Sequence, residues 1–325
     1  MLGSCRLCPR NCGVDRTAGK TGFCRAPLKP KVARAALHFW EEPCLSGVQG
    51  SGAVFFSHCN LKCTFCQNYR ISQEHFGREV DIPTLTSIFR ELEQQGAHNI
   101  NLVSPTPYIP QVAAAIKKAR SLGMKIPVVY NSNAYEEAGA LAQLEGLVDV
   151  YLPDLKYAGQ ETAARFSGAP DYFAAASQTI REMYRQVGLP SFDTGGLMTG
   201  GLMIRHLILP GQLADTFLVS SCSIPFAILI LPGQLADTQQ VLRWIAGNFP
   251  REVYVSLMAQ YFPAYRAVQT PPLNRRLTGQ EYNQAMETLL QLGLESGYVQ
   301  ELTAADECYV PPFDGTGVPG SLPSD

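Results

Sequence analysis

The chain has 325 residues, of which 46% are hydrophobic, and a formal net charge of −2 at pH 7. This length and apolar content predict a globular protein with a large buried core, folded as one barrel-sized domain or two smaller ones. The sequence contains no run of five lysines or arginines, which argues against a nucleic-acid partner. It also lacks an N-terminal apolar signal segment and any apolar run long enough to span a bilayer, so we expect a cytoplasmic protein without a membrane partner.

Seven of the ten cysteines form two tight groups, which in a reducing compartment indicate metal sites rather than disulfides. The first group comprises Cys5, Cys8, Cys12 and Cys24 and lies in a segment punctuated by glycine and proline. This segment has too little apolar surface to fold by itself, so a structural metal is the natural account of its fold. Zinc and a second iron–sulfur cluster both fit four thiolates, and the alternative is four reduced, free thiols.

The second group, Cys59, Cys63 and Cys66, directly follows the apolar, strand-like run 52–58. Iron–sulfur clusters are held by cysteine thiolates, usually one per iron, so three thiolates would leave one iron of a four-iron cluster open for chemistry. A zinc knuckle and buried free thiols are the alternatives. Zinc sites usually gather four ligands, and free thiols have no reason to keep this spacing after a strand, so the pattern favours a 4Fe–4S cluster.

After these cysteines, segments with the spacing of one helical face alternate with short apolar strands. The predicted strands are 52–58, 99–103, 126–130, 148–152, 202–209 and 253–257. The predicted helices are 85–96, 112–123, 135–144, 172–184, one through Trp244, and a last one that begins at the capping box Thr278 to Glu281. This alternation predicts right-handed βαβ units in an α/β fold with a parallel sheet. Six strands fit a partial (β/α)6, TIM-like barrel better than a closed eight-stranded one.

The spacing of Cys59, Cys63 and Cys66, with Phe65 before the last cysteine, resembles the signature of the radical S-adenosylmethionine (SAM) superfamily. The resemblance implies that the open iron chelates the amino and carboxylate groups of SAM. It also implies that an electron from the reduced cluster splits the sulfonium and gives a 5′-deoxyadenosyl radical. The implied fold is a partial barrel of the radical SAM type, and the implied electron donor is a protein such as flavodoxin or ferredoxin.

Polar residues follow the predicted strands, at the edge where catalytic groups gather in parallel barrels. They are 104–107, 131–133, Asp154 with Lys156, Arg205 with His206, and 260–261. SAM needs charge partners for its amino-acid end, hydroxyl partners for its ribose and a flat apolar surface for its adenine, and these residues can supply all three. Each residue taken singly could instead make turn hydrogen bonds. His38, Glu41 and Glu42, before the first predicted strand, could face the active site, but their chemistry alone favours a solvated or capping role.

Further motifs narrow the resemblance to one group within this superfamily. Asp154-Leu155-Lys156, Phe166-Ser167-Gly168 and 205–211 are similar to the pyruvate formate-lyase activating enzyme and its close relatives, in which the first and last of these elements help to hold the nucleotide. Other stretches resemble an uncharacterised branch of those homologues, and this likeness covers nearly the whole chain. They are the N-terminal cysteine motif, 40–43, 66–68 and 260–263.

Two departures from the activating enzymes concern the substrate. Those enzymes carry Asp-Thr-Asn-Gly after the third strand, whereas 131–134 here reads Asn-Ser-Asn-Ala and lacks the carboxylate that would help to bind a monovalent cation. A Gly-Gly-Glu-like element at the second strand is also absent. The resemblance therefore implies SAM binding more firmly than it implies activation of a glycyl-radical enzyme.

The resemblance implies a radical SAM oxidoreductase, similar to the activating enzymes, that abstracts hydrogen from an unknown protein or small-molecule substrate. It implies catalytic and metal roles for Cys59, Cys63 and Cys66, and cofactor binding by Phe65, Asn133, Asp154, Lys156 and Arg205. The alternative is a non-catalytic iron–sulfur or zinc protein that carries electrons or acts as a scaffold. We expect three parts: a cysteine-rich extension (1–48), the barrel (49–302) and a C-terminal tail (303–325).

An exact repeat interrupts the predicted barrel. The ten residues 207–216 recur without a change as 229–238, 22 positions later. Repeat architectures need at least three units, so a single exact copy does not indicate a solenoid. Only one copy can occupy the fifth strand, and the position of Arg205 favours the first. We predict that 217–231 forms a poorly packed extra segment at the barrel rim, and that 217–238 is an insertion or a duplication of the coding sequence.

Overall fold

The computed structural model describes residues 2–211, 237–305 and 310–320. A ten-stranded sheet organises this part of the chain. Its spatial order is β10 (Gly297–Val299), β9 (Tyr254–Met258), β8 (Met198–Leu207), β6 (Val150–Pro153), β5 (Val128–Ser132), β4 (Ile100–Val103), β2 (Ser51–Phe56), β1 (Lys31–His38) and β3 (Arg78–Glu79), with β7 (Ser191–Phe192) paired to β8. The predicted segment 217–231 lies outside the described residues.

The six predicted strands correspond to β2, β4, β5, β6, β8 and β9, which pair in parallel, and β10 extends this parallel series beyond β9. The sequence did not predict β1, which runs antiparallel to both β2 and β3. The described ends of the sheet, β10 and β3, are not paired with each other, so the barrel is open. The predicted partial α/β barrel is therefore confirmed.

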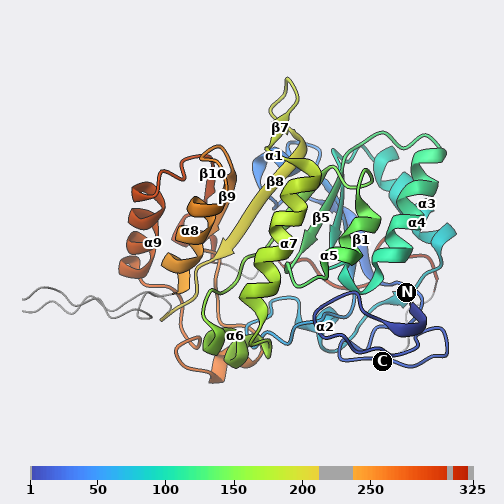
Figure 1. Cartoon of the computed structure of the whole chain (residues 1–325). Coiled ribbons are helices and arrows are strands. Elements are labelled where there is room, and N and C mark those ends of the chain that lie inside the picture. Colours follow the sequence, from blue (N-terminus) through green and yellow to red (C-terminus); the bar gives the residue numbers. More distant parts are fainter. Residues whose placement is uncertain (1, 212–236, 306–309, 321–325) are drawn as a thin grey trace, which may run out of the picture.

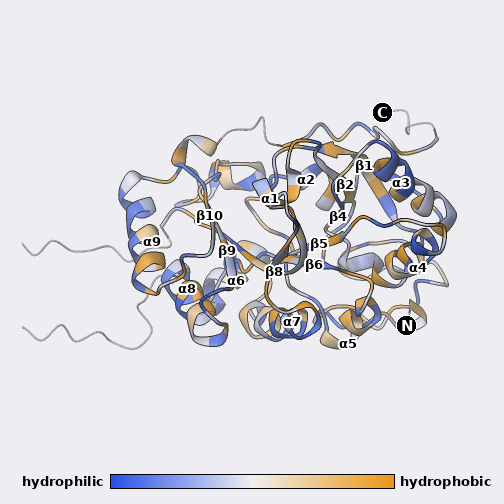
Figure 2. Ribbon diagram, turned by 90° about the horizontal axis from the view of Figure 1, so that it is seen from above, coloured by the Kyte–Doolittle hydropathy of each residue, from blue (hydrophilic) through white to orange (hydrophobic). Residues whose placement is uncertain are grey.

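Five helices lie along the outer, convex face of the curved sheet (Figure 2). They are α3 (Ile82–Gln94), α4 (Ile109–Ser121), α5 (Ala138–Leu141), α7 (Tyr172–Val187) and α8 (Asp237–Asn248). The other helices are α1 (Pro43–Ser46), α2 (Tyr69–Ser72), α6 (Gln160–Ser167), α9 (Gly279–Gln291) and the 3-10 turns η1 (Leu2–Ser4), η2 (Thr106–Tyr108), η3 (Ala142–Leu144), η4 (Tyr265–Gln269) and η5 (Leu302–Ala304). The helix predicted at 135–144 is thus only one α-helical turn followed by a 3-10 turn.

Local signals explain where the regular helices begin. In α3 the side chain of Asp81 accepts a hydrogen bond from the backbone N–H of Thr84, 2.8 Å away, and so caps the first turn. The predicted capping box of α9 is present, because Thr278 and Glu281 each bond the other's backbone N–H. Glu281 also accepts a hydrogen bond from the N–H of Gly211 (2.6 Å), which ties the end of the strand region to α9.

The N-terminal loops lie at the edge of the sheet where the parallel strands end (Figure 1). The C-terminal segment 310–320 packs against β1 through backbone bonds from Gly315 N–H to Ala33 O and from Ala35 N–H to Thr316 O. The phenyl ring of Phe313 meets that of Phe55 edge-on, with 5.5 Å between centroids. The N-terminal loops therefore border the ends of the strands, whereas the C-terminal segment borders the concave side of the sheet, where it lines the cavity through Val310 and Pro311.

The described parts of the two sequence repeats build one strand-to-helix connection. The first copy supplies the end of β8 and the buried residues Ile208 and Leu209. The second copy supplies Asp237 and Thr238 at the start of α8. The Oδ1 atom of Asp237 accepts the backbone N–H groups of 158–159, and Thr238 Oγ1 lies 3.1 Å from His206 Nε2.

We predict that deleting 217–238 leaves a folded protein. The deletion places Asp215 and Thr216 directly before Gln239, so the same Asp-Thr pair begins α8. Thermal unfolding and iron content should match the full chain, and the shorter protein should be more soluble. Deleting 215–238 instead removes the pair and should cost about 1–2 kcal/mol. Loss of bound iron in the 217–238 deletion would show that these residues belong to the fold.

The intact mass of protein from the native source tests whether the duplication is a coding artefact. A chain of full predicted mass would exclude the artefact.

A buried carboxylate in the core predicts a pH dependence of stability. Glu136 Oε1 accepts a hydrogen bond from Thr106 (2.5 Å), while Oε2 has no partner among the described residues. Burial raises the pKa of Glu136 to about 7, above the value of 4.5 for an unhindered glutamate. The folded state therefore binds the proton more tightly, so the free energy of unfolding falls as pH rises from about 4.5 through about 7.

The variant Glu136→Gln keeps the hydrogen bonds and removes the titration. At pH 8 it should be more stable than the parent protein, by roughly 3 kcal/mol at most, and the difference should vanish near pH 4.5. Urea unfolding across this pH range measures the difference. Glu137 is exposed, so Glu137→Gln is the matched control and should follow the parent curve. Parallel curves for Glu136→Gln and the parent would contradict the prediction.

Candidate active site

The loop that follows β2 carries Cys59, Cys63 and Cys66 toward the concave side of the sheet. The turn begins at His58, whose φ of 72° is rare for a residue with a side chain. Each sulfur has a polar neighbour. Cys59 Sγ accepts hydrogen bonds from Leu61 N–H (3.4 Å) and Asn133 Nδ2 (3.3 Å). The hydroxyls of Ser167 and Ser72 lie 2.9 Å from Cys63 Sγ and 3.2 Å from Cys66 Sγ.

Burial raises the pKa of all three thiols, that of Cys66 to about 11. A positive metal centre would offset this cost, because ligating thiols are bound as thiolates. Within residues 2–211, 237–305 and 310–320, no three His, Cys, Asp or Glu side chains meet closely enough to hold one metal ion. The three sulfurs instead border an open cavity of about 200 Å³, so they suit a group larger than a single ion.

The cavity collects residues from the ends of most parallel strands. Its lining includes Phe65, Asn68, Ser104, Asn131, Asn133, Asp154, Lys156, Arg205, Gln260, and, from the C-terminal segment, Val310. All five residues predicted to bind the cofactor are therefore in one place with the three cysteines. This convergence follows from parallel pairing, which brings the carboxyl ends of the strands to one edge.

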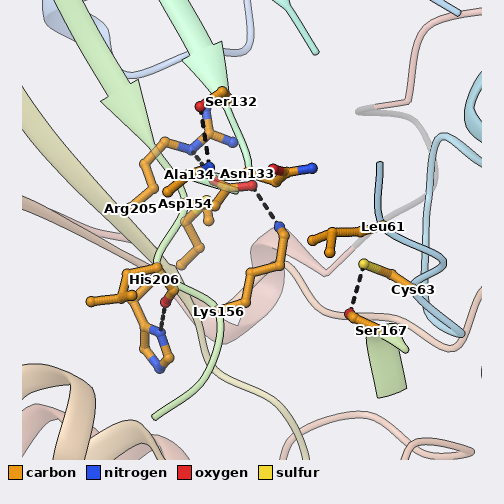
Figure 3. A network of polar contacts seen from close by, with 12 residues as sticks. Leu61, Cys63, Ser132, Asn133, Ala134, Asp154, Lys156, Ser167, Arg205 and His206 are labelled. Carbon is orange, nitrogen blue, oxygen red and sulfur yellow. Dashed lines mark hydrogen bonds and ion pairs between the residues drawn. The ribbon is translucent and has the colours of Figure 1, made fainter. Parts of the chain in front are cut away.

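Charged side chains form a network on one wall of the cavity (Figure 3). Lys156 Nζ lies 2.7 Å from Asp154 Oδ2, and Arg205 Nε lies 3.4 Å from Asp154 Oδ1. Burial alone would raise the pKa of Asp154, but the charges of Lys156 and Arg205 outweigh it and lower that pKa. Burial would lower the pKa of Lys156, but Asp154 and Cys63 outweigh it and raise that pKa. The pair therefore stays ionised near neutral pH.

The observed position of Glu41 differs from the one favoured by the sequence. A solvated or capping role was predicted, but the loop after β1 crosses the concave face and buries this side chain to 9% exposure. Glu41 Oε2 lies 2.9 Å from Arg205 Nη1, and Oε1 accepts a hydrogen bond from Asn101 Nδ2 (2.9 Å). Glu42 Oε2 stands 3.9 Å from the same arginine nitrogen. Nothing in the local spacing indicates this path, because it depends on where the unpredicted β1 ends.

The third predicted strand also needs a correction. It was expected to end at residue 130, but β5 continues through Asn131 and Ser132, so these residues lie in the strand. The turn follows at Ala134, whose φ is 57°. Asn133 then donates through Nδ2 to both Cys59 Sγ and Asn60 Oδ1 (2.9 Å). This residue therefore links the end of β5 to the cysteine loop.

Phe65 occupies an aromatic patch at the side of the cavity. Its ring lies 6.3 Å, centroid to centroid, from the rings of both Tyr157 and Tyr261. Tyr157 in turn places its hydroxyl 2.8 Å from Ser167 Oγ, the atom that contacts Cys63. Phe65 itself lines the cavity and gives it an apolar surface beside the sulfurs.

Comparison with known proteins supports a family assignment. Residues 53–204 match the radical SAM superfamily. Over 301 residues the chain is 30% identical to an uncharacterised protein of Methanocaldococcus jannaschii, a match that covers 91% of this chain and 77% of that protein. The chain belongs to the radical SAM superfamily. None of the described helices is long and apolar enough to cross a membrane.

Two solved structures align with parts of the chain at low sequence identity. A domain of the pyruvate-formate lyase-activating enzyme from Bacteroides vulgatus is 13% identical, with a TM-score of 0.40, and the match covers 61% of this chain and 94% of that one. SuiB from Streptococcus suis is 11% identical, with a TM-score of 0.46, and the match covers 78% of this chain. The matched region spans 50% of the SuiB chain.

The ion network predicts a large cost for losing its central cation. Arg205→Met removes the cation that pairs with Glu41 and Glu42 and leaves Asp154 with Lys156 alone among the described residues, so buried carboxylates lose a partner. We expect the free energy of unfolding to fall by about 3 kcal/mol, measured by urea unfolding.

Arg185→Met is the matched control for this variant. It removes an exposed arginine that pairs with Glu145 and Glu182, so no measurable change is expected. If Arg205→Met changed stability as little as this control, the buried network would not be coupled to folding.

Proposed function

We propose that this chain is a radical SAM enzyme in which Cys59, Cys63 and Cys66 bind a 4Fe–4S cluster and the cavity beside them binds SAM. Membership of the superfamily implies both groups. The donor set supports the assignment, because three cysteine sulfurs with hydrogen-bonding neighbours border one cavity. When bound, the reduced cluster supplies the electron that cleaves SAM to methionine and a 5′-deoxyadenosyl radical.

Unpaired polar atoms in the cavity support binding of an amino-acid group. Asp154 Oδ1 and Arg205 Nε have no hydrogen-bond partner of good geometry among the described residues, although they face each other at 3.4 Å. A ligand with both an ammonium and a carboxylate group can satisfy one atom of each sign. We assign Asp154, Lys156 and Arg205 to orienting the charged part of SAM, Asn133 to the region beside Cys59, and Phe65 to the adenine.

The reaction that follows is hydrogen abstraction from a protein or a small molecule. Use as an activase, in which the hydrogen comes from a backbone glycine of a partner enzyme, is one form of this reaction. The carboxylate found after the third strand of activating enzymes is replaced here by Asn131, and that position lies inside β5. We place the enzyme in the cytoplasm, with flavodoxin or ferredoxin as electron donor, because its thiols need reducing conditions.

Release of 5′-deoxyadenosine tests the proposal. Protein reconstituted anaerobically with iron and sulfide, then given dithionite and SAM, should release it. Cys63→Ala should lose the cluster's absorbance, isotopic SAM binding and the product together, because one of its three ligands is gone. Cys44→Ala is the matched control, since Cys44 is also buried but does not line this cavity.

Two outcomes would oppose the enzymatic function. A full cluster without any product would favour the alternative of a non-catalytic iron–sulfur protein. Tight SAM binding by Cys63→Ala would show that SAM binds without the cluster, against the proposed arrangement.

A further inference from the structure

The first cysteine group surrounds a second cavity, at the side of the cysteine loop. This cavity of about 20 Å³ is lined by Cys5, Cys8, Cys12 and Cys24, although the last of these is 12 residues from its nearest partner in sequence. Asn60, from the loop that carries the other cysteine group, completes the lining. Four cysteines from one segment therefore line one cavity without any regular helix or strand other than η1 to direct them.

Backbone groups hold this arrangement. Cys5 exchanges hydrogen bonds with the turn, because its N–H donates to Val14 O and its carbonyl accepts from Gly13 N–H, both at 2.9 Å. Phe23 N–H donates to Cys12 Sγ at 3.4 Å. Gly22 makes this approach possible, since a Cβ there would come within 2.7 Å of that sulfur. The loop is thus shaped to present sulfur atoms to the cavity.

Two arginines, the buried Arg16 and the half-buried Arg10, line the same cavity with unused buried donors. Arg16 is 2% exposed and donates to the carbonyls of Pro107 and Pro27, but its Nε–H has no partner among the described residues. Arg10 likewise leaves Nη2 without a partner. Buried cationic donors are costly unless they meet an anion. A metal centre with four thiolate ligands carries net negative charge and accepts hydrogen bonds on sulfur, so it satisfies both arginines.

The volume of the cavity favours a cluster over zinc. A zinc ion holds each sulfur at about 2.3 Å, so four sulfurs would close on the ion and leave no room for a water-sized sphere between them. Here a cavity of about 20 Å³ is present, and no three ligand side chains in the described part of the chain meet around a single-ion position. The same holds for Cys59, Cys63 and Cys66 at the other cavity.

Short paths connect the two cysteine groups. The carbonyl of Cys24 lies 3.0 Å from His58 Nδ1, and His58 is bonded directly to Cys59. Asn60, which directly follows Cys59 in the chain, lines the second cavity together with Cys8. The path through His58 thus crosses from one group to the other by one hydrogen bond, the His58 side chain and one peptide unit.

We propose that Cys5, Cys8, Cys12 and Cys24 bind a second iron–sulfur cluster that relays electrons to the cluster at Cys59, Cys63 and Cys66. The relay rests on the proposed function, whereas the second cluster does not. A one-electron donor protein such as flavodoxin or ferredoxin reduces the second cluster. That cluster then passes the electron to the first and returns to its oxidised state. One electron enters and one electron leaves for each SAM cleaved, so no further reactant is needed.

Iron content and spectroscopy test the second cluster. The full chain, reconstituted anaerobically, should bind about eight iron ions. Cys12→Ser/Cys24→Ser should bind about four, and Cys59→Ala/Cys63→Ala/Cys66→Ala should also bind about four and show a reduced-cluster EPR signal. Cys44→Ala should match the parent protein. Zinc bound at this site would overturn the proposal, and so would absence of iron from the Cys59→Ala/Cys63→Ala/Cys66→Ala variant. Both outcomes can be measured even if the Cys12→Ser/Cys24→Ser variant fails to fold.

Comparing two reductants tests the relay. Dithionite is a small reductant that can reach the first cluster without a relay, whereas flavodoxin docks on the protein surface. For Cys12→Ser/Cys24→Ser, the ratio of flavodoxin-driven to dithionite-driven 5′-deoxyadenosine release should fall at least tenfold below that of the parent protein. An unchanged ratio would overturn the relay. Absence of product from the parent protein with about eight irons would reject the proposed function and leave the second cluster standing.

Discussion

Parallel pairing of the central strands is the constraint on which the site depends. It brings the ends of β2, β4, β5, β6, β8 and β9 to one edge, where residues distant in sequence line one cavity. The chain turns sharply there, because His58, Ser104 and Ala134 have positive φ values of 72°, 58° and 57° just after β2, β4 and β5. Backbone conformations of this kind cost energy and concentrate at functional sites. The open edge of the sheet leaves the cavity accessible.

The charged wall of the cavity places ionised side chains where burial is energetically unfavourable. Burial disfavours each ionised group, yet Asp154 and Lys156 stay charged because each is the other's closest partner. Arg205 joins them to Glu41, which arrives from outside the parallel strands. A purely apolar wall would be no less stable, since buried ion pairs often only break even against apolar packing. The network is therefore better explained by the ligand that its unpaired atoms can bind.

The sequence predicted those features that depend on local pattern. Apolar runs located the six parallel strands, and the cysteine spacing located the loop between β2 and α2. Features that depend on tertiary contacts were missed. The strand Lys31–His38 contains Lys31, Arg34 and three alanines, a composition that does not favour strands, and forms because β2 and β3 pair with it. Pairing with neighbouring strands likewise extends β5 to Asn131 and Ser132. The position of Glu41 follows from the unpredicted β1.

Direct contacts tie the N-terminal extension to the cysteine loop. Arg10 donates from Nε to Asn60 O (3.0 Å) and from Nη1 to Gly168 O (2.7 Å), and its guanidinium lies 3.9 Å from the centroid of the Phe23 ring. One side chain thus joins the extension, the loop that carries Cys59 and the end of α6. Ordering of the first cysteine group therefore restrains the loop of the second. A metal at the extension would stabilise the geometry of both groups, whichever of them is filled first.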